Sequence, residues 1–262
     1  MAGEGDSMKQ KSVCSDGGDE KIYSDKDPTV ELLNTKQLNI GPTKKLIILG
    51  IGGLLCHRVC YKERSQVPIY RQHDAAYGSY KVYKRPFCED FMKFCLERFE
   101  VGIWSSAREW YLNSALDCIT SGLKSKLLFA WDQDYCTNTG FGTLEEKNKP
   151  IFLKELKQVW GRNWHTGRYS ELSTLLIDDK PYKALLNPPH TAIFPTEYKA
   201  NIVGDDALGP NGELRLYLAG LADADDVPTY VKAHPFGQPA ITARHADWDY
   251  YSKVINTFSS KK

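Results

Sequence analysis

The chain has 262 residues, of which 42% are hydrophobic, 12% aromatic and 26% charged, a composition that excludes a largely disordered protein. Its 34 Lys and Arg nearly balance 33 Asp and Glu, so the formal charge of +1 does not indicate a surface dedicated to nucleic acid or to an anionic membrane. The longest apolar run, at 46–56, is shorter than the roughly 20 residues that a membrane helix needs.

Residues 1–43 are polar and contain no apolar signal-peptide core, so we expect a disordered N-terminal tail. The seven cysteines of the chain have no spacing typical of a disulfide framework, which indicates free thiols in a reducing compartment. We therefore expect a soluble, intracellular protein of the nucleus or the cytoplasm.

Short apolar runs downstream of the tail predict buried strands. In chain order they are KLIIL (45–49), VGIW (101–104), KLLFAW (126–131), TLLI (174–177) and TAIF (191–194). Helical patterns alternate with them, at 86–95, 107–119, 152–160, 213–222 and 227–234. This alternation predicts an α/β, Rossmann-like fold in which helices flank a central parallel sheet.

We expect one domain at 44–240, followed by a weakly structured C-terminal extension at 241–262. The turn-rich stretch at 133–149 lies between two predicted elements, so it is interpreted as a small insertion near the carboxyl edge of the sheet.

Polar or unusual residues follow three of the predicted strands. They are Gly50-Ile51-Gly52-Gly53, Ser105-Ser106 and Asp178-Asp179. The carboxyl ends of parallel strands share one edge of a sheet, where ligands bind. A hydroxyl and an ammonium group such as that of Lys154 can hold phosphate oxygens, and a carboxylate can hold Mg²⁺. This combination suits a phosphate and a metal at the same edge.

The order of these residues resembles the haloacid dehalogenase superfamily of phosphohydrolases. More specifically, it is similar to the RNA polymerase II C-terminal-domain phosphatases, or NLI-interacting-factor-like phosphatases, in a plant-type branch. The resemblance runs from about residue 44 to 237 and is carried by YKRPFCEDFMKFCLERFEVGIWSSA (83–107), KLLFAWDQDYC (126–136), KPIFLKEL (149–156) and TLLIDDKPYKALLNPPHTAIFP (174–195). It implies phosphoserine or phosphothreonine substrates. It also implies that Ser105 and Lys154 hold the phosphoryl group while Asp178 and Asp179 order Mg²⁺.

The sequence departs from the family at the first motif. That motif places a nucleophilic Asp and, two residues on, a second acid that exchanges protons, but this chain has Gly50 and Gly52. Glycine supplies neither a nucleophile nor a metal ligand, so we expect a loss of about 10⁴–10⁶ in rate and weakened Mg²⁺ binding. The amides of Gly50, Gly52 and Gly53 instead suggest a nest for an anion.

These features predict a pseudophosphatase that binds a phosphorylated peptide, metabolite or partner protein without hydrolysing it. Two enzymatic alternatives stay open. One is a Mg²⁺-dependent phosphoserine/phosphothreonine phosphatase with residual activity, in which a water or a nearby acid replaces the nucleophile. Asp132 and Asp134 are the nearby acids in the sequence that could replace the lost carboxylate. The other is a repurposed enzyme that acts on a small molecule in the same pocket. A scaffold without any ligand is a further possibility.

Simpler interpretations exist for single features. The glycines could form an ordinary turn, Ser105 could merely end a strand, and Lys154 could lie on the solvated face of a helix. Cys56, His57 and Cys60 have poor spacing for zinc and are interpreted as structural residues.

Overall fold

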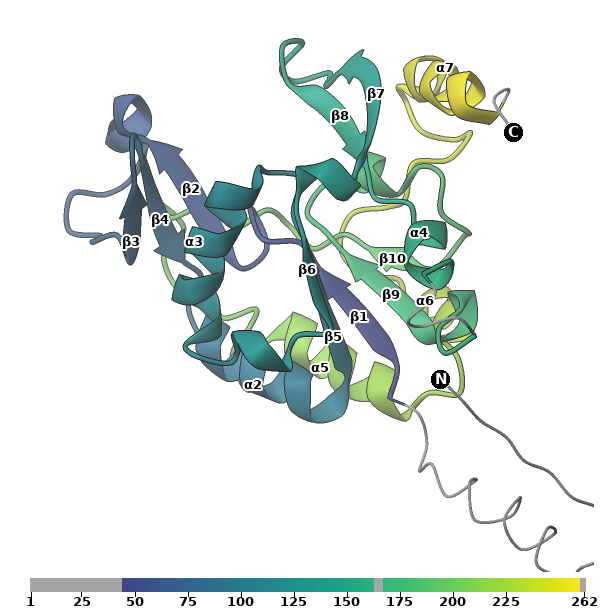
Figure 1. Ribbon diagram of the computed structural model, residues 1–262, viewed down its shortest axis with the longest axis horizontal. Helices are drawn as coiled ribbons and strands as arrows, with labels where there is room; N and C mark the ends of the chain where they lie inside the picture. The colour runs from purple at the N-terminus through teal and green to yellow at the C-terminus, as the bar shows by residue number, and fades with distance from the viewer. Residues whose placement is uncertain (1–43, 163–166, 260–262) are drawn as a thin grey trace, which may run out of the picture. The chain divides into compact units, whose positions relative to one another are not determined.

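The computed structural model describes residues 44–162 and 167–259 (Figure 1). Its strands are β1 (Leu46–Leu49), β2 (Cys56–Cys60), β3 (Ala75–Tyr77), β4 (Tyr80–Lys84), β5 (Glu100–Trp104), β6 (Phe129–Trp131), β7 (Thr137–Gly142), β8 (Pro150–Leu153), β9 (Thr174–Ile177) and β10 (Ala192–Ile193). Its helices are α2 (Cys88–Arg98), α3 (Glu109–Thr120), α4 (Lys157–Trp160), α5 (Glu213–Asp223), α6 (Val227–Ala233) and α7 (Trp248–Ser259). The predicted tail at 1–43 lies outside the described residues.

The centre of the fold is a five-stranded sheet in the order β10-β9-β1-β5-β6, and every neighbouring pair is parallel. The five apolar runs of the sequence form these five strands, which confirms the predicted parallel sheet. β1 and β10 begin one residue later than expected, at Leu46 and Ala192. The start of β6 is shifted further, to Phe129, and residues 124–126 form a 3-10 turn ahead of it.

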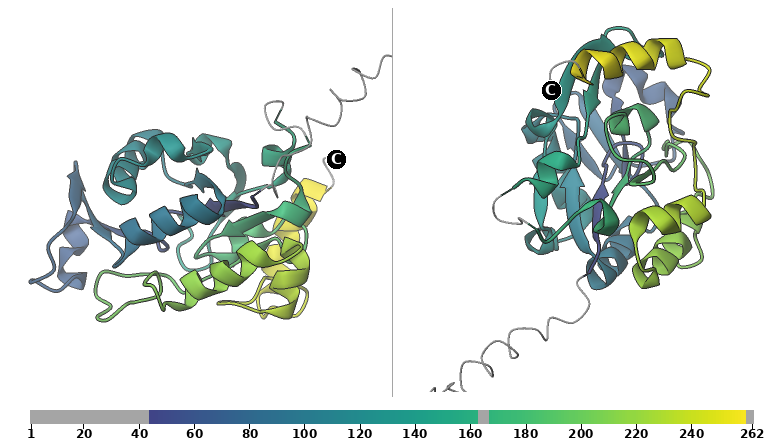
Figure 2. Two further views of the ribbon diagram at one scale, coloured as in Figure 1. Left: turned by 90° about the horizontal axis from the view of Figure 1, so that it is seen from below. Right: turned by 90° about the vertical axis from the view of Figure 1, so that its right-hand side faces the viewer.

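Both faces of this sheet are covered, which explains why its strands are continuously apolar. Along β1, Ile47 and Leu49 belong to the core cluster that also contains side chains of α2, α3, α5 and α6. Leu46 and Ile48 belong to a second cluster with Trp104 and residues of α4. Figures 1 and 2 show the helices distributed about the sheet in this way. The alternation of side chains along the strand thus joins two cores.

The helices predicted at 86–95, 107–119, 213–222 and 227–234 correspond to α2, α3, α5 and α6. The helix predicted at 152–160 is wrong in its first half, which is strand β8, and only the single turn α4 is helical. Burial alternates along β8, with Ile151 and Leu153 fully buried, and this period of two favours a strand. The insertion predicted at 133–149 contains β7 and the loop at 143–149, and β8 completes an antiparallel hairpin just after it.

A second, antiparallel sheet in the order β2-β4-β3 is formed by residues 56–84, where no strand was predicted. Val59 of β2 and Tyr83 of β4 are buried with Val67 and Ala200 in a small cluster of their own. This sheet follows directly from the loop after β1, so it places β2 beside the carboxyl edge of the central sheet.

The C-terminal segment differs from the expectation of weak structure, because α7 is an amphipathic helix. Tyr251 and Val254 on its inner face are buried with Ile151, Leu153 and Tyr182. The Tyr250 hydroxyl also donates a hydrogen bond to the carbonyl of Gly142 in the hairpin. Packing of this apolar face against the hairpin stabilises the helix, as is usual for short helices in proteins.

The six cysteines in the described part of the chain are free thiols. Among the same residues, no helix is both long and apolar enough to cross a membrane.

Truncating Val254 to Ala should lower the free energy of unfolding by about 1–3 kcal/mol, because it opens a cavity in the cluster that α7 shares with the hairpin. Lys253→Ala, at an exposed neighbour on α7, should change it by no more than about 0.5 kcal/mol. Urea denaturation measures both. Equal stability of Val254→Ala and the parent would mean that α7 contributes nothing to the folded unit.

Candidate functional site

The predicted site residues meet at the carboxyl edge of the central sheet. The loop at 50–55 follows β1, Ser105 and Ser106 follow β5, and Asp178 and Asp179 follow β9. Lys154 reaches this edge from the end of β8, and the hairpin rather than a helix delivers it. It is 1% exposed, so the interpretation of Lys154 as a solvated helix residue is wrong. The structure thus brings all four motif positions together, while the roles of their residues stay predictions.

Asp178 lies at the centre of the site, fully buried between two lysines. The ammonium group of Lys154 donates to Oδ2 of Asp178 and to the carbonyl of Trp104. On the other side, Nζ of Lys183 lies 2.6 Å from Oδ1 of Asp178, which also accepts a 3.2 Å bond from the backbone N–H of Lys180. Both carboxylate oxygens are therefore bound by cationic groups of the chain itself.

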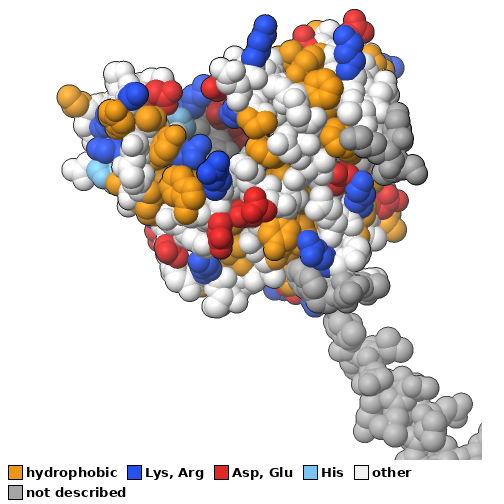
Figure 3. All heavy atoms as spheres, turned by 45° about the horizontal axis from the view of Figure 1, so that its top comes forward, with side chains coloured by type: hydrophobic (Ala, Val, Ile, Leu, Met, Phe, Trp, Pro, Cys, Tyr) orange, Lys and Arg blue, Asp and Glu red, His pale blue; other side chains and the backbone are white. Residues whose placement is uncertain are grey.

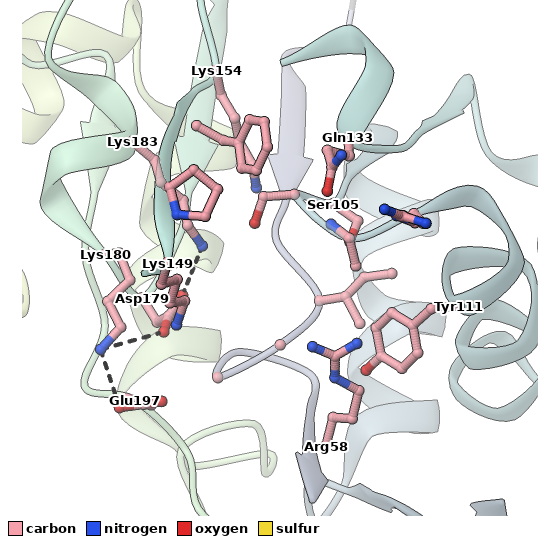
Figure 4. Close-up of a pocket in the computed structure, with 18 of the residues that line it drawn as sticks. Arg58, Ser105, Tyr111, Gln133, Lys149, Lys154, Asp179, Lys180, Lys183 and Glu197 are labelled. Atoms are coloured by element: carbon pink, nitrogen blue, oxygen red, sulfur yellow. Dashed lines mark hydrogen bonds and ion pairs between the residues drawn. The ribbon is translucent and has the colours of Figure 1, made fainter. Parts of the chain in front are cut away.

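Asp179 shares the second lysine with its neighbour. Its Oδ1 lies 3.2 Å from Nζ of Lys183, and its Oδ2 lies 4.0 Å from Nζ of Lys180. Lys180 in turn pairs with Glu197 at 3.2 Å. Figure 4 shows this chain of ion pairs along one side of the cavity. The two buried carboxylates and the two buried ammonium groups balance in charge.

Burial alone would raise the pKa of Asp178, but the positive charges of Lys154 and Lys183 outweigh burial and hold it well below its usual range. The pKa of Asp179 is raised, first by burial and then by the negative charge of Asp178, although Lys183 opposes the shift. Burial would lower the pKa of Lys183, yet the two carboxylates raise it above its ordinary value. Asp178 and Lys183 thus form a fixed ion pair at neutral pH.

The glycine loop is held by backbone hydrogen bonds. The N–H of Gly50 donates to the carbonyl of Ile177 at 2.8 Å, and that of Gly53 donates to the carbonyl of Cys56 at 2.9 Å. Two of the three amides are therefore engaged, which contradicts the expected nest of Gly50, Gly52 and Gly53 amides. Gly53 remains part of the cavity wall.

Two of these glycines also leave space for the acids. A Cβ at Gly50 would lie 2.8 Å from Oδ2 of Asp178, and one at Gly53 would lie 2.4 Å from Oδ2 of Asp179. Gly53 has φ of +76°, which other residues rarely adopt. Nothing lies within 4 Å of a Cβ at Gly52. The loop and the acidic pair therefore fit each other only because positions 50 and 53 lack side chains.

Ser105 is placed to donate. Its Oγ accepts a 3.0 Å hydrogen bond from the N–H of Ala107, which leaves the hydroxyl hydrogen for another acceptor. Its backbone N–H donates to the carbonyl of Trp131 at 2.7 Å, so the strand end is fixed. Ser106 lines the same cavity.

The residues that follow the sheet edge enclose a cavity of about 520 Å³. Its lining includes six basic side chains, Arg58, Arg108, Lys149, Lys154, Lys180 and Lys183, and two acidic ones, Asp179 and Glu197. Figure 3 shows the hollow with basic side chains at its margin, and Figure 4 shows Arg58 and Tyr111 facing the lysines across it. The lining is therefore electropositive even though the chain as a whole is nearly neutral.

Two basic residues of this cavity were not predicted from the sequence, namely Arg58 at its rim and Lys183 at its floor. Arg58 lies on β2, in the sheet that was not predicted, and its guanidinium group stacks 4.7 Å from the ring of Tyr80 and 4.5 Å from that of Tyr111. The pairing of Lys183 with Asp179 could have been predicted from the sequence. The two residues are four positions apart, a spacing that brings side chains together in a helical turn.

The acids suggested as replacements for the lost carboxylate do not serve that purpose. Oδ1 of Asp132 accepts a hydrogen bond from the N–H of Asp134 at 3.1 Å and caps a short 3-10 turn. Neither residue lines the cavity, although Gln133 between them does. This arrangement contradicts the idea that Asp132 or Asp134 stands in at the site.

A sequence model described as NLI interacting factor-like phosphatase matches residues 45–228, which is most of the chain. The chain belongs to this family. The match confirms the phosphatase-like resemblance, whereas the plant-type branch stays a prediction.

The chain has low sequence identity to three relatives of this kind. An FCP1 homology domain-containing protein of Schizosaccharomyces pombe is 27% identical over 203 residues, which cover 74% of this chain and 78% of the relative. Among solved structures, Fcp1, described as an essential RNA polymerase II CTD phosphatase, has 16% identity and a TM-score of 0.41. A fission yeast Fcp1 variant bound to beryllium fluoride has 15% identity and a TM-score of 0.40. In both cases 87% of this chain matches 65% of the solved chain, which is less than two thirds of its length.

Phosphatases of this family generally use Mg²⁺, an ion that prefers six oxygen ligands in an octahedron. The residues present here do not fit it. Positions 50 and 52 are glycines and offer no carboxylate, and both oxygens of Asp178 are bound by lysines. Residues 44–162 and 167–259 contain no group of three or more His, Cys, Asp or Glu side chains that could hold a metal ion.

Gly50→Ala should lower the free energy of unfolding by about 1–3 kcal/mol, because the new methyl group would overlap a carboxylate that two lysines hold in place. Gly52→Ala adds the same methyl group two residues away, in open space, and should change it by at most about 0.5 kcal/mol. Urea denaturation of the two variants checks this. Equal stabilities would show that the Asp178 carboxylate is free to move.

Proposed function

We propose that this member of the family is a pseudophosphatase: it binds a phosphorylated ligand at the former catalytic edge and does not form an aspartyl-phosphate. The observation that carries the proposal is an electropositive cavity over an edge where glycines occupy both first-motif positions. The cavity offers groups that bind an anion and lacks the group that would attack it.

The loss of attack follows from the chemistry of position 50. An aspartyl-phosphate needs a carboxylate aimed at phosphorus, and Gly50 has no side chain. The nearest buried carboxylate, Asp178, accepts hydrogen bonds from Lys154 and Lys183, so its charge is neutralised and its orientation is fixed. A carboxylate that is paired with two ammonium groups is a weak nucleophile. These contacts support loss of the family reaction.

The capacity to bind an anion rests on the rim of the cavity rather than on its floor. Lys154 and Lys183 are paired with Asp178, and Lys180 is paired with Glu197. Arg58, Arg108 and Lys149 are exposed, and none of them forms an ion pair with an acidic side chain of the described residues. Together with the Ser105 hydroxyl, they supply charge-assisted donors for phosphate oxygens.

Peptides that carry phosphoserine or phosphothreonine are the first ligands to test. A cavity of about 520 Å³ admits a phosphorylated side chain or a small metabolite. Trp110 at its edge is 51% exposed and offers an apolar surface to residues that flank the phosphate. A phosphorylated metabolite and a phosphorylated partner protein are the other ligands of this class.

Binding of a phosphoserine peptide should weaken about 10-fold or more in Arg58→Ala and in Arg108→Ala, because each loses a charge-assisted hydrogen bond of about 1.5–3 kcal/mol. Arg244→Ala, which removes an exposed arginine outside the cavity, should bind as the parent does. Fluorescence anisotropy measures the dissociation constants, with the unphosphorylated peptide as ligand control. Unchanged affinity in both cavity variants would remove the rim from the proposal.

Turnover of p-nitrophenyl phosphate by the parent should equal that of Asp178→Asn, with or without Mg²⁺, because neither protein has a nucleophile at position 50. The variant also controls for a contaminating phosphatase. Mg²⁺-dependent turnover that disappears in Asp178→Asn, or a trapped phospho-enzyme, would instead support a phosphatase with residual activity.

A further inference from the structure

One ammonium group bridges the two adjacent acids of the site. Nζ of Lys183 lies 2.6 Å from Oδ1 of Asp178 and 3.2 Å from Oδ1 of Asp179. Two neighbouring carboxylates after a buried strand need a cation between them, because uncompensated buried charge is costly. Here the chain provides that cation itself.

The carboxylates offer little to a second cation. Oδ2 of Asp178 is bound by Lys154, and Oδ1 of the same side chain accepts from Lys183 and from the N–H of Lys180. A metal ion would have to displace at least one ammonium group that is buried with its partner. Displacement of that kind would leave the lysine charge without a counter-charge in the core.

Lys183 is held in position by its local structure. It lies in the 3-10 turn Pro181–Ala184, which Pro181 begins, and its backbone N–H donates to the carbonyl of Lys180 at 3.1 Å. Its carbonyl accepts the N–H of Lys154 at 2.8 Å, so the turn is joined to the end of β8. The neighbouring Tyr182 is buried in the cluster formed with α7. The backbone hydrogen bonds of Lys183 and the burial of Tyr182 therefore hold the turn that carries the ammonium group in place.

We infer that Lys183 is a built-in cation that takes over the charge-neutralising role of a divalent metal, and that this site works without metal. The inference concerns Asp178, Asp179 and Lys183 only. It does not require that a phosphorylated ligand binds the cavity, so it can fail or hold independently of the proposed function.

The experiment titrates the full chain with MgCl₂ by isothermal calorimetry and measures its Tm in EDTA and in MgCl₂. Three proteins are compared, namely the parent, Lys183→Met and the control Lys180→Met. Lys180 lies on the same turn but is 25% exposed and 4.0 Å from Asp179. Methionine keeps an unbranched side chain that ends before the ammonium position of lysine, and it removes the charge.

The parent should give no saturable heat and no Tm shift with Mg²⁺. In EDTA, Lys183→Met should lose roughly 6–20 °C in Tm, because the acidic pair loses its counter-charge. MgCl₂ should recover a large part of that loss, since the freed carboxylates now accept the metal. Lys180→Met should lose less and should not respond to Mg²⁺.

Saturable Mg²⁺ binding by the parent that disappears in Asp178→Asn would overturn the inference, and this measurement does not depend on the folding of Lys183→Met. A folded Lys183→Met protein whose Tm is the same in EDTA and MgCl₂ would overturn it as well. An equal Mg²⁺ response in the two lysine variants would show that position 183 has no special role.

Discussion

A single buried carboxylate organises the carboxyl edge of the central sheet. Asp178 directly follows β9, while its two cationic partners come from the end of the β7–β8 hairpin and from the 3-10 turn after β9. A charge that is fully removed from water has to be compensated by groups of fixed position. The hairpin, the turn and the central sheet are therefore held in one arrangement by the electrostatics of this group as well as by apolar packing.

The glycine loop and the lysines form one consistent arrangement. An acid at position 50 would add a third carboxylate next to Asp178 and would collide with it. Gly50 instead leaves room for the Asp178 carboxylate to accept a hydrogen bond from Lys154. Lys183 then supplies the positive charge that the acidic pair requires. The absence of acids after β1 and the presence of a lysine after β9 thus both contribute to charge balance among buried groups.

Much of the fold and the position of the site could be predicted from the sequence, because continuous apolar runs such as 46–49 and 174–177 indicate strands buried on both faces. The motif order likewise places Ser105, Lys154 and Asp178 at one edge. The partners of these residues could not be predicted, since ion pairs depend on tertiary distances. Arg58 lies on β2 (CHRVC), which is short and has no regular alternation of apolar and polar residues. β8 was not recognised because the helical turn α4 follows it closely, so both were interpreted as one helix. The backbone hydrogen bonds of Gly50 and Gly53 also could not be predicted from a glycine-rich sequence.

The C-terminal helix has a consequence for how the boundaries of the protein are drawn. The family match stops at residue 228, yet α7 begins twenty positions later and shares its buried side chains with β8 and with Tyr182. Those two segments carry Lys154 and Lys183. A fragment that ends at residue 228 would keep every motif but would lose the helix that packs behind both lysines. The folded unit of this protein therefore extends beyond the residues that the family model matches.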